Sequence, residues 1–196
     1  MATLNLTKEL ELLVADIVRV MPEFGHIDPQ RVLVCIAPTR SGGIHGTYAR
    51  IHPLRFEGGS RTVTVRRRGK VLRCEIPPVM SRGVEVLYII CFLVPRFLNL
   101  SLREKLVTVF HELFHIAPDF SGDIRRFPGK NYAHGSSRKR FNELMEKLVG
   151  TYLERVGSAE GFRFLDGDME TIRARYGTVV GKKMAAPRVR YSVEGG

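Results

Sequence analysis

Two histidines and a glutamate near the middle of the chain have the types and spacing of a metal-dependent catalytic site. The sequence HELFH places His111 and His115 four residues apart, with Glu112 directly after the first histidine. Residues four apart on a helix share a face, so both imidazoles can bind one tetrahedral zinc ion. Glu112 lies one step round the helix, where its carboxylate can act as general base on a zinc-activated water. The motif therefore predicts a Zn²⁺-dependent hydrolase.

A third metal ligand is expected downstream of this motif, because catalytic zinc usually has three protein ligands and one position for water. We predict that His134 is this ligand, since it lies in the segment YAHGS just before the next expected helix. Glu143 on that helix is the main alternative, although it lies opposite the apolar stripe of its own helix. Asp119 and Asp123 are further alternatives.

Tyr132 is the candidate transition-state stabiliser. It lies two residues before His134 in the sequence. A phenol can donate a hydrogen bond to the oxyanion that forms when water attacks a carbonyl group. Packing of the ring against the protein is the alternative role for this residue.

The helix that must carry the motif has clear signals at both ends. Ser101 and Glu104 are spaced as a capping box, in which each side chain satisfies a backbone N–H of the first turn. Pro118 disfavours helical geometry at Ala117 and predicts the end of the helix there. Four apolar residues fall on the side opposite to the two histidines: Leu102, Leu106, Val109 and Leu113.

Apolar periodicity predicts the elements around this helix. Residues 6–21 and 137–155 have the period of amphipathic helices. Runs rich in β-branched residues predict strands at 31–37, 47–56, 61–66, 71–76 and 84–94. We therefore expect an α+β fold with an N-terminal helix, a small twisted, mainly antiparallel sheet, the motif helix and a C-terminal packing helix. The strand at 84–94 is expected to border the cleft.

Length and composition fit one globular domain with an extension. The chain has 196 residues and is 44% hydrophobic, which suffices for one core. We expect a catalytic domain over 1–157 and a basic, partly flexible C-terminal extension over 158–196. The three cysteines, Cys35, Cys74 and Cys91, are too widely spaced for a zinc ribbon and are expected to be reduced thiols in a core.

The strong positive charge favours polyanionic partners. The 31 Lys and Arg exceed the 20 Asp and Glu, giving a net charge of +11 and a pI near 10.0. Non-specific DNA or RNA binding through the basic clusters is therefore expected. No apolar run is long enough to cross a membrane, and no basic segment leads into an apolar stretch at the N-terminus, which predicts a cytoplasmic protein.

The region around the motif resembles two known groups. HELFH, followed by a loop and an Ala-His-Gly segment that leads into an amphipathic helix, is similar to the SprT-like metallopeptidases, which include the Spartan DNA–protein crosslink proteases. The longer stretch HELFHIAPDFSG, with Ile124 and Arg125 after it, resembles small putative phage metallopeptidases. Both resemblances imply a minimal zincin core in which His111, His115 and His134 bind zinc and Glu112 is the base.

Two functions from different classes follow. The first is a zinc metallopeptidase that hydrolyses peptide bonds in protein or peptide substrates. The second is a non-catalytic nucleic-acid-binding protein with a structural or vestigial zinc site. The sequence leaves the substrate and the oligomeric state open.

Overall fold

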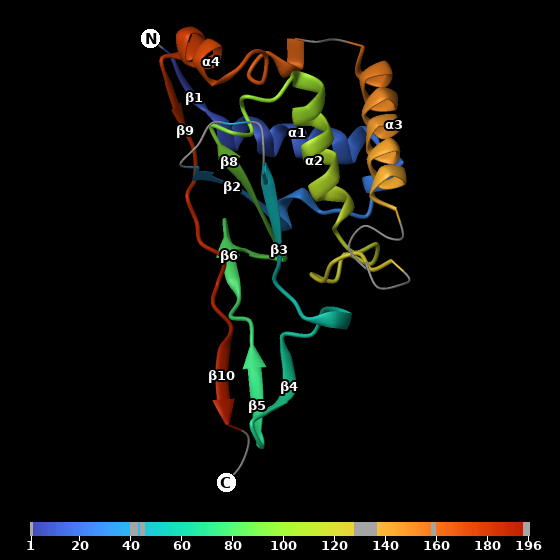
Figure 1. The fold of residues 1–196 in the computed structure, drawn as a ribbon, viewed down its shortest axis with the longest axis vertical. Coiled ribbons are helices and arrows are strands. Elements are labelled where there is room, and N and C mark those ends of the chain that lie inside the picture. Colours follow the sequence, from blue (N-terminus) through green and yellow to red (C-terminus); the bar gives the residue numbers. More distant parts are fainter. Residues whose placement is uncertain (1, 40–42, 44–45, 128–136, 158–159, 194–196) are drawn as a thin grey trace.

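The molecule has a helix-rich body at one end and an extended β-arm at the other (Figure 1). The computed structural model describes residues 2–39, 43, 46–127, 137–157 and 160–193. The helices are α1 (Leu6–Val20), α2 (Leu102–Phe114), α3 (Arg138–Val156) and α4 (Met169–Tyr176). The strands are β1 (Thr3–Asn5), β2 (Val32–Pro38), β3 (Ala49–Pro53), β4 (Thr62–Arg67), β5 (Lys70–Glu75), β6 (Val79–Ser81), β7 (Val84–Val86), β8 (Tyr88–Val94), β9 (Thr178–Val180) and β10 (Arg190–Val193). The expected α+β fold is confirmed.

A three-stranded sheet in the order β2-β8-β3 forms the centre of the body. Strand β8 pairs in parallel with β2 and antiparallel with β3. Ile90 faces the core beneath the helices, whereas Ile89 and Cys91 face a second core on the other side of the sheet. Burial on both faces explains why this strand reads as a continuous apolar run.

This arrangement corrects the prediction for residues 84–94. They form two strands, β7 and β8, separated at Leu87, whose N–H bonds to the carbonyl of Arg31. Strand β8 is the central strand of the sheet, so it does not border the cleft. Strands β2 and β3 are the two edges of the sheet, and β3 packs beside α2. A run buried on both faces is typical of a central strand, and the sequence alone did not place its neighbours.

The two amphipathic helices at 6–21 and 137–155 are confirmed as α1 and α3. The side chain of Asn5 caps α1, and that of Ser137 caps α3. Helix α3 ends at Gly157, which adopts the left-handed conformation common after helix C-termini. The hydroxyl of Tyr152 donates to the Asp16 carboxylate at 2.6 Å and so joins the two helices. None of the helices in the described ranges has the length and hydrophobicity of a membrane span.

The predicted start of α2 is confirmed, but the helix ends earlier than expected. Ser101 and Glu104 form the reciprocal capping box. The last helical residue is Phe114, and His115 is the C-cap. The chain leaves the helix here because the His115 carbonyl accepts from the N–H of Arg125 at 2.7 Å and Ile116 forms a bridge with Ile124. The returning segment thus ends the helix together with Pro118, which has no N–H to donate to the Phe114 carbonyl.

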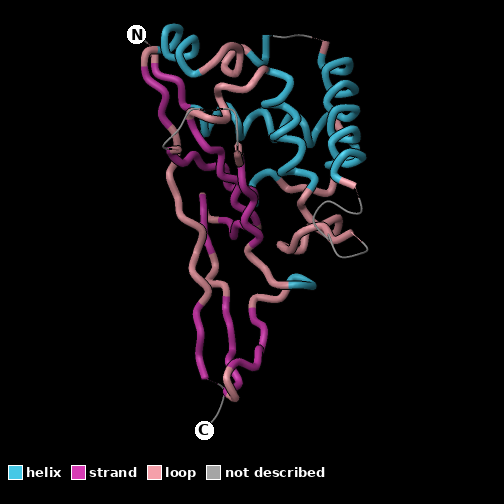
Figure 2. The backbone as a smooth tube through the Cα atoms, viewed as in Figure 1, coloured by secondary structure: helices cyan, strands magenta, loops and turns pink. Residues whose placement is uncertain are grey.

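The predicted hairpin is confirmed and forms most of the arm. Strands β4 and β5 pair antiparallel, and Arg68 and Gly69 in the turn both have positive φ. This pair of conformations characterises the two-residue turns that match the twist of hairpins. Strand β10 adds to the other side of β5, so three strands leave the body together (Figure 2). The three cysteines are buried free thiols, as expected.

The C-terminal residues pack on the body through backbone pairing. Strand β9 pairs in parallel with β1, and the N–H of Lys182 donates to the Thr7 hydroxyl at 2.8 Å. The carbonyl of Lys182 accepts from the N–H of Ile36. The sequence did not predict α4, β9 or β10, because these short segments have weak periodicity of their own.

Lys105 links this C-terminal segment to α2. Its side chain is fully buried, and the ammonium donates to the carbonyl of Leu165 at 2.7 Å and to that of Gly167. Burial lowers the pKa of Lys105 to about 8, although the nearby Asp166 and Asp168 raise it. The cation thus ties the middle of α2 to the loop before α4.

Replacing Lys105 with methionine should destabilise the protein. Methionine fills a similar volume but leaves the carbonyls of Leu165 and Gly167 without their donor, which costs about 2–4 kcal/mol of unfolding free energy. Urea unfolding of the variant measures this loss. Lys147→Met on the exposed side of α3 is the control, with an expected change below about 0.5 kcal/mol. Equal stability of the two variants would contradict the role of Lys105.

Candidate catalytic site

Helix α2 brings His111 and His115 together at its C-terminal end. Their ring centroids lie 4.7 Å apart, with the rings edge to face. His111 is half-buried and His115 is buried. Both rings also contact Phe141 of α3, at centroid distances of 5.0 and 5.8 Å. The four-residue spacing puts the two imidazoles on one side of the helix, and Phe141 packs against both.

Glu112 points to a different environment from the histidines. Its side chain is only 7% exposed, and the backbone N–H of Ile51 in β3 donates to its carboxylate. Burial raises the pKa of Glu112 to about 7, partly offset by this hydrogen bond. A buried carboxylate with one backbone donor keeps further acceptor capacity for a proton or a hydrogen bond.

A cavity of about 460 Å³ opens beside these residues. His111 and Glu112 line it from α2, and Asn142 and Glu146 line it from α3. Residues 46–49, which lead into the edge strand β3, form the opposite wall. The cavity thus combines two groups of the HELFH motif with the edge of a sheet.

The segment after α2 fixes the position of His115. The guanidinium of Arg125 lies 4.3 Å from the centroid of the Phe114 ring, and its Nε donates to the Phe114 carbonyl. Tyr88 of β8 donates its hydroxyl to the Asp123 carbonyl at 2.8 Å. These contacts, with the backbone bond between Arg125 and His115, anchor the C-terminal end of α2 to the sheet.

The two aspartates considered as metal ligands form hydrogen bonds in and around the segment after α2. The carboxylate of Asp123 accepts from the backbone N–H groups of Ile124 and Gly58 and pairs with Arg126 at 3.1 Å. That of Asp119 accepts from the N–H of Ser121 at 3.2 Å. Both carboxylates thus have partners in the structure around the loop.

Glu143 lies on the outside of α3. Its side chain is 62% exposed, and a carboxylate oxygen lies 4.0 Å from the ammonium of Lys139. The predicted residues His134 and Tyr132 lie outside the described residues. Within the described ranges, no group of three His, Cys, Asp or Glu side chains converges on a metal position. The structure therefore brings together two of the three predicted ligands.

The donors that are described fit a zinc site. Neutral imidazole nitrogens are preferred zinc ligands, and two of them adjoin each other at the end of one helix. Glu112 and His111 line the same cavity. This set can hold a metal with the help of one further ligand and can exchange a proton next to it.

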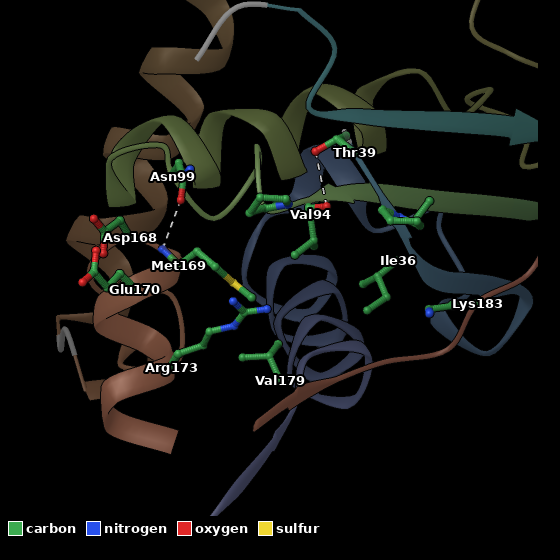
Figure 3. A pocket seen from close by; sticks show the side chains of 13 residues that line it. Ile36, Thr39, Val94, Asn99, Asp168, Met169, Glu170, Arg173, Val179 and Lys183 are labelled. Atoms are coloured by element: carbon green, nitrogen blue, oxygen red, sulfur yellow. Dashed lines mark hydrogen bonds between the residues drawn. The ribbon is translucent and has the colours of Figure 1, made fainter. Parts of the chain in front are cut away.

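A larger cavity, of about 690 Å³, lies elsewhere, between the ends of β2 and β8 and helix α4 (Figure 3). It contains no histidine among its lining residues, and two of its polar side chains have structural roles. Asn99 accepts from the N–H of Met169 at 3.1 Å, and Asp168 accepts from the N–H of Thr171 to cap α4. We therefore place the candidate site in the smaller cavity.

Sequence reasoning missed the groups that complete the cavity wall. Asn142 and Glu146 are four residues apart, so their shared helix face was a readable signal. Glu146 also accepts from Nε of Arg103 on α2 at 2.6 Å, which connects the two helices beside the cavity. No local pattern indicated that β3 would form the opposite wall.

Comparison with known proteins gives one match. A family model described as putative phage metallopeptidase matches residues 4–152, which run from β1 into α3. The matched range includes His111, Glu112, His115 and the position of His134. Searches of curated proteins and of solved structures gave no match.

Proposed function

The chain belongs to the putative phage metallopeptidase family, and from this premise we propose that it is a zinc-dependent enzyme that hydrolyses peptide bonds. His111, His115 and His134 would hold the metal. The observation that carries the proposal is the pair of imidazoles with ring centroids 4.7 Å apart, together with a buried glutamate that lines a cavity with one of them. When bound there, zinc would polarise the scissile carbonyl and lower the pKa of the attacking water.

Glu112 acts as the general base. Its carboxylate takes a proton from the attacking water and passes it to the nitrogen of the leaving amine. The N–H of Ile51 orients the carboxylate, and burial keeps bulk water away from it. Tyr132 is proposed to donate to the oxyanion that forms on the substrate.

The start of the edge strand β3, before Ile51 whose N–H is taken by Glu112, is proposed to bind the substrate backbone. An extended peptide can add to an exposed sheet edge through main-chain hydrogen bonds. Strand β3 is the outer strand beside α2, and residues 46–49 line the same cavity as Glu112. A peptide laid along this edge would present a carbonyl group to the end of α2.

Removing the metal tests the proposal. Treatment with a zinc chelator should abolish cleavage of casein, an unstructured protein, because the ligands alone cannot activate water. Adding Zn²⁺ after the chelator is removed should restore cleavage. Zinc content measured by mass spectrometry on the same samples relates cleavage to metal.

Two outcomes would overturn the proposal. Full cleavage by the metal-free protein would exclude a metal-dependent mechanism. Bound zinc without any cleavage would instead favour the alternative, a non-catalytic nucleic-acid-binding protein with a structural or vestigial zinc site.

A further inference from the structure

The arm formed by β4, β5 and β10 carries a dense positive charge. Residues 61–75 and 188–193 contain eight cationic side chains and one carboxylate, that of Glu75. Within the described ranges, only Arg61 among the eight forms an ion pair, with Glu85. The other seven are exposed to solvent: Arg66, Arg67, Arg68, Lys70, Arg73, Arg188 and Arg190. The net charge of the chain is thus concentrated on a projecting element.

The strand register sorts the arm into two unlike faces. Thr64, Arg73 and Ser192 lie directly opposite one another on neighbouring strands and so share a face. Arg66 and Arg190 alternate onto the same face. The other face exposes the apolar side chains of Val63, Val65, Tyr191 and Val193, with Arg67 and Lys70 at its outer end. The first face therefore offers guanidinium and hydroxyl donors together, with the carboxylate of Glu75 opposite Arg190.

Among the described residues, the far end of the arm has two strands and its base has three. Strand β4 pairs with β5 as far as Arg67 and Lys70, whereas the described residues of β10 pair only with 72–75. The tip, residues 66–71, carries four cations and no carboxylate. The major groove of B-DNA is about 12 Å wide and admits a two-stranded β-ribbon. Figure 1 shows the arm extending away from the helices of the body.

We propose that the arm binds duplex DNA without sequence specificity, with the hairpin tip in the major groove and Arg66, Arg73 and Arg190 on the phosphates. Guanidinium groups match phosphate oxygens in bidentate geometry, and seven of the eight cations of the arm are arginines. The major groove of duplex RNA is deep and narrow, so the ribbon discriminates against it. The arm contributes no residue to the cavity at His111, so this surface is independent of the proposed peptidase activity.

Salt-dependent DNA binding tests the proposal. Affinity of the full chain for a short fluorescent duplex is measured by anisotropy over a range of salt. Replacing Arg66, Arg73 and Arg190 with glutamine should lower the slope of log affinity against log salt by about 2.7, since each phosphate contact contributes roughly 0.9. A second variant, with Arg67 and Lys70 replaced by glutamine, should lower it by about 1.8 if both contact phosphates.

The control variant removes the same number of positive charges, three, from the body of the molecule. Arg140, Arg163 and Arg173 are exposed and form no ion pair within the described part of the chain. Their triple glutamine variant should keep the wild-type slope, and thermal unfolding checks that all variants are folded. Absence of binding at low salt, a wild-type slope in both arm variants, or equal losses in arm and body variants would each overturn the proposal.

Titrations with other polyanions test whether the partner of the arm is DNA, RNA or a membrane surface. Vesicles containing phosphatidylserine and a duplex RNA of the same length replace the DNA in parallel titrations. We expect the wild-type protein to prefer DNA over both at equal salt. If the arm variants lose vesicle or RNA binding while DNA binding is unchanged, the arm serves a different partner and the proposal is wrong.

Discussion

Replacing Glu112 with glutamine should lower casein turnover by about two to four orders of magnitude, the usual contribution of a general base, while zinc stays bound. The amide keeps the size of the carboxylate and can still accept from the N–H of Ile51. It cannot accept the proton of the attacking water. Chemistry is thus removed while the cavity and the metal ligands remain.

Zinc content and casein turnover must be measured on the same preparations of this variant. Glu143→Gln is the matched control, because Glu143 lies exposed on α3 and pairs only loosely with Lys139, at 4.0 Å. It should retain both zinc and activity. Full activity in the Glu112 variant would refute the proposed mechanism, and loss of its zinc would show that Glu112 supports the metal rather than the proton transfer.

The parts of the fold that the sequence predicted are those with local causes. The capping box at Ser101, the period of α1 and the turn at Gly69 each act within a few residues. The end of α2 at Phe114 depends on a bond between His115 and Arg125, ten residues later. Local patterns report contacts between neighbours in sequence, so this long-range bond left no readable signal.

Sheet order and the burial of Lys105 were missed for the same reason. The apolar run of β8 indicated a buried strand, but whether β2 and β3 flank it is decided by packing across the whole body. Lys105 reads as an ordinary exposed helix residue, because its acceptors lie at Leu165 and Gly167 in a distant loop. A buried cation is rare unless paired, so no sequence rule would have selected it.

In the candidate site, too, the features with local causes were predictable and those that depend on distant segments were not. The spacing of His111 and His115 follows from helix geometry, so their proximity was predictable, and the 4.7 Å between their rings agrees with it. The burial of Glu112 was not predictable, because it depends on β3 lying against α2. A third ligand from a loop must approach the end of α2, and no periodic pattern in the sequence predicts which loop residue does so.

Removing a proposed metal ligand should abolish both zinc binding and activity. His111→Ala and His115→Ala each take away one of the two adjacent imidazoles, which leaves too few ligands for a tight site. His134→Ala should behave in the same way if it is the third ligand. Because His115 is buried against Phe141, its variant also needs a test of folding that does not depend on activity.

Thermal unfolding with and without added zinc supplies that test and assigns the third ligand. A metal that binds only the folded protein raises the unfolding temperature, so the wild-type protein and the Glu112→Gln and Glu143→Gln variants should gain stability on addition of zinc. The three histidine variants should unfold cooperatively but gain none. If His134→Ala keeps its zinc, its stabilisation and its activity, the assignment of His134 is wrong. If Glu143→Gln loses all three instead, Glu143 is the third ligand and must turn from its exposed position towards the two histidines when zinc binds.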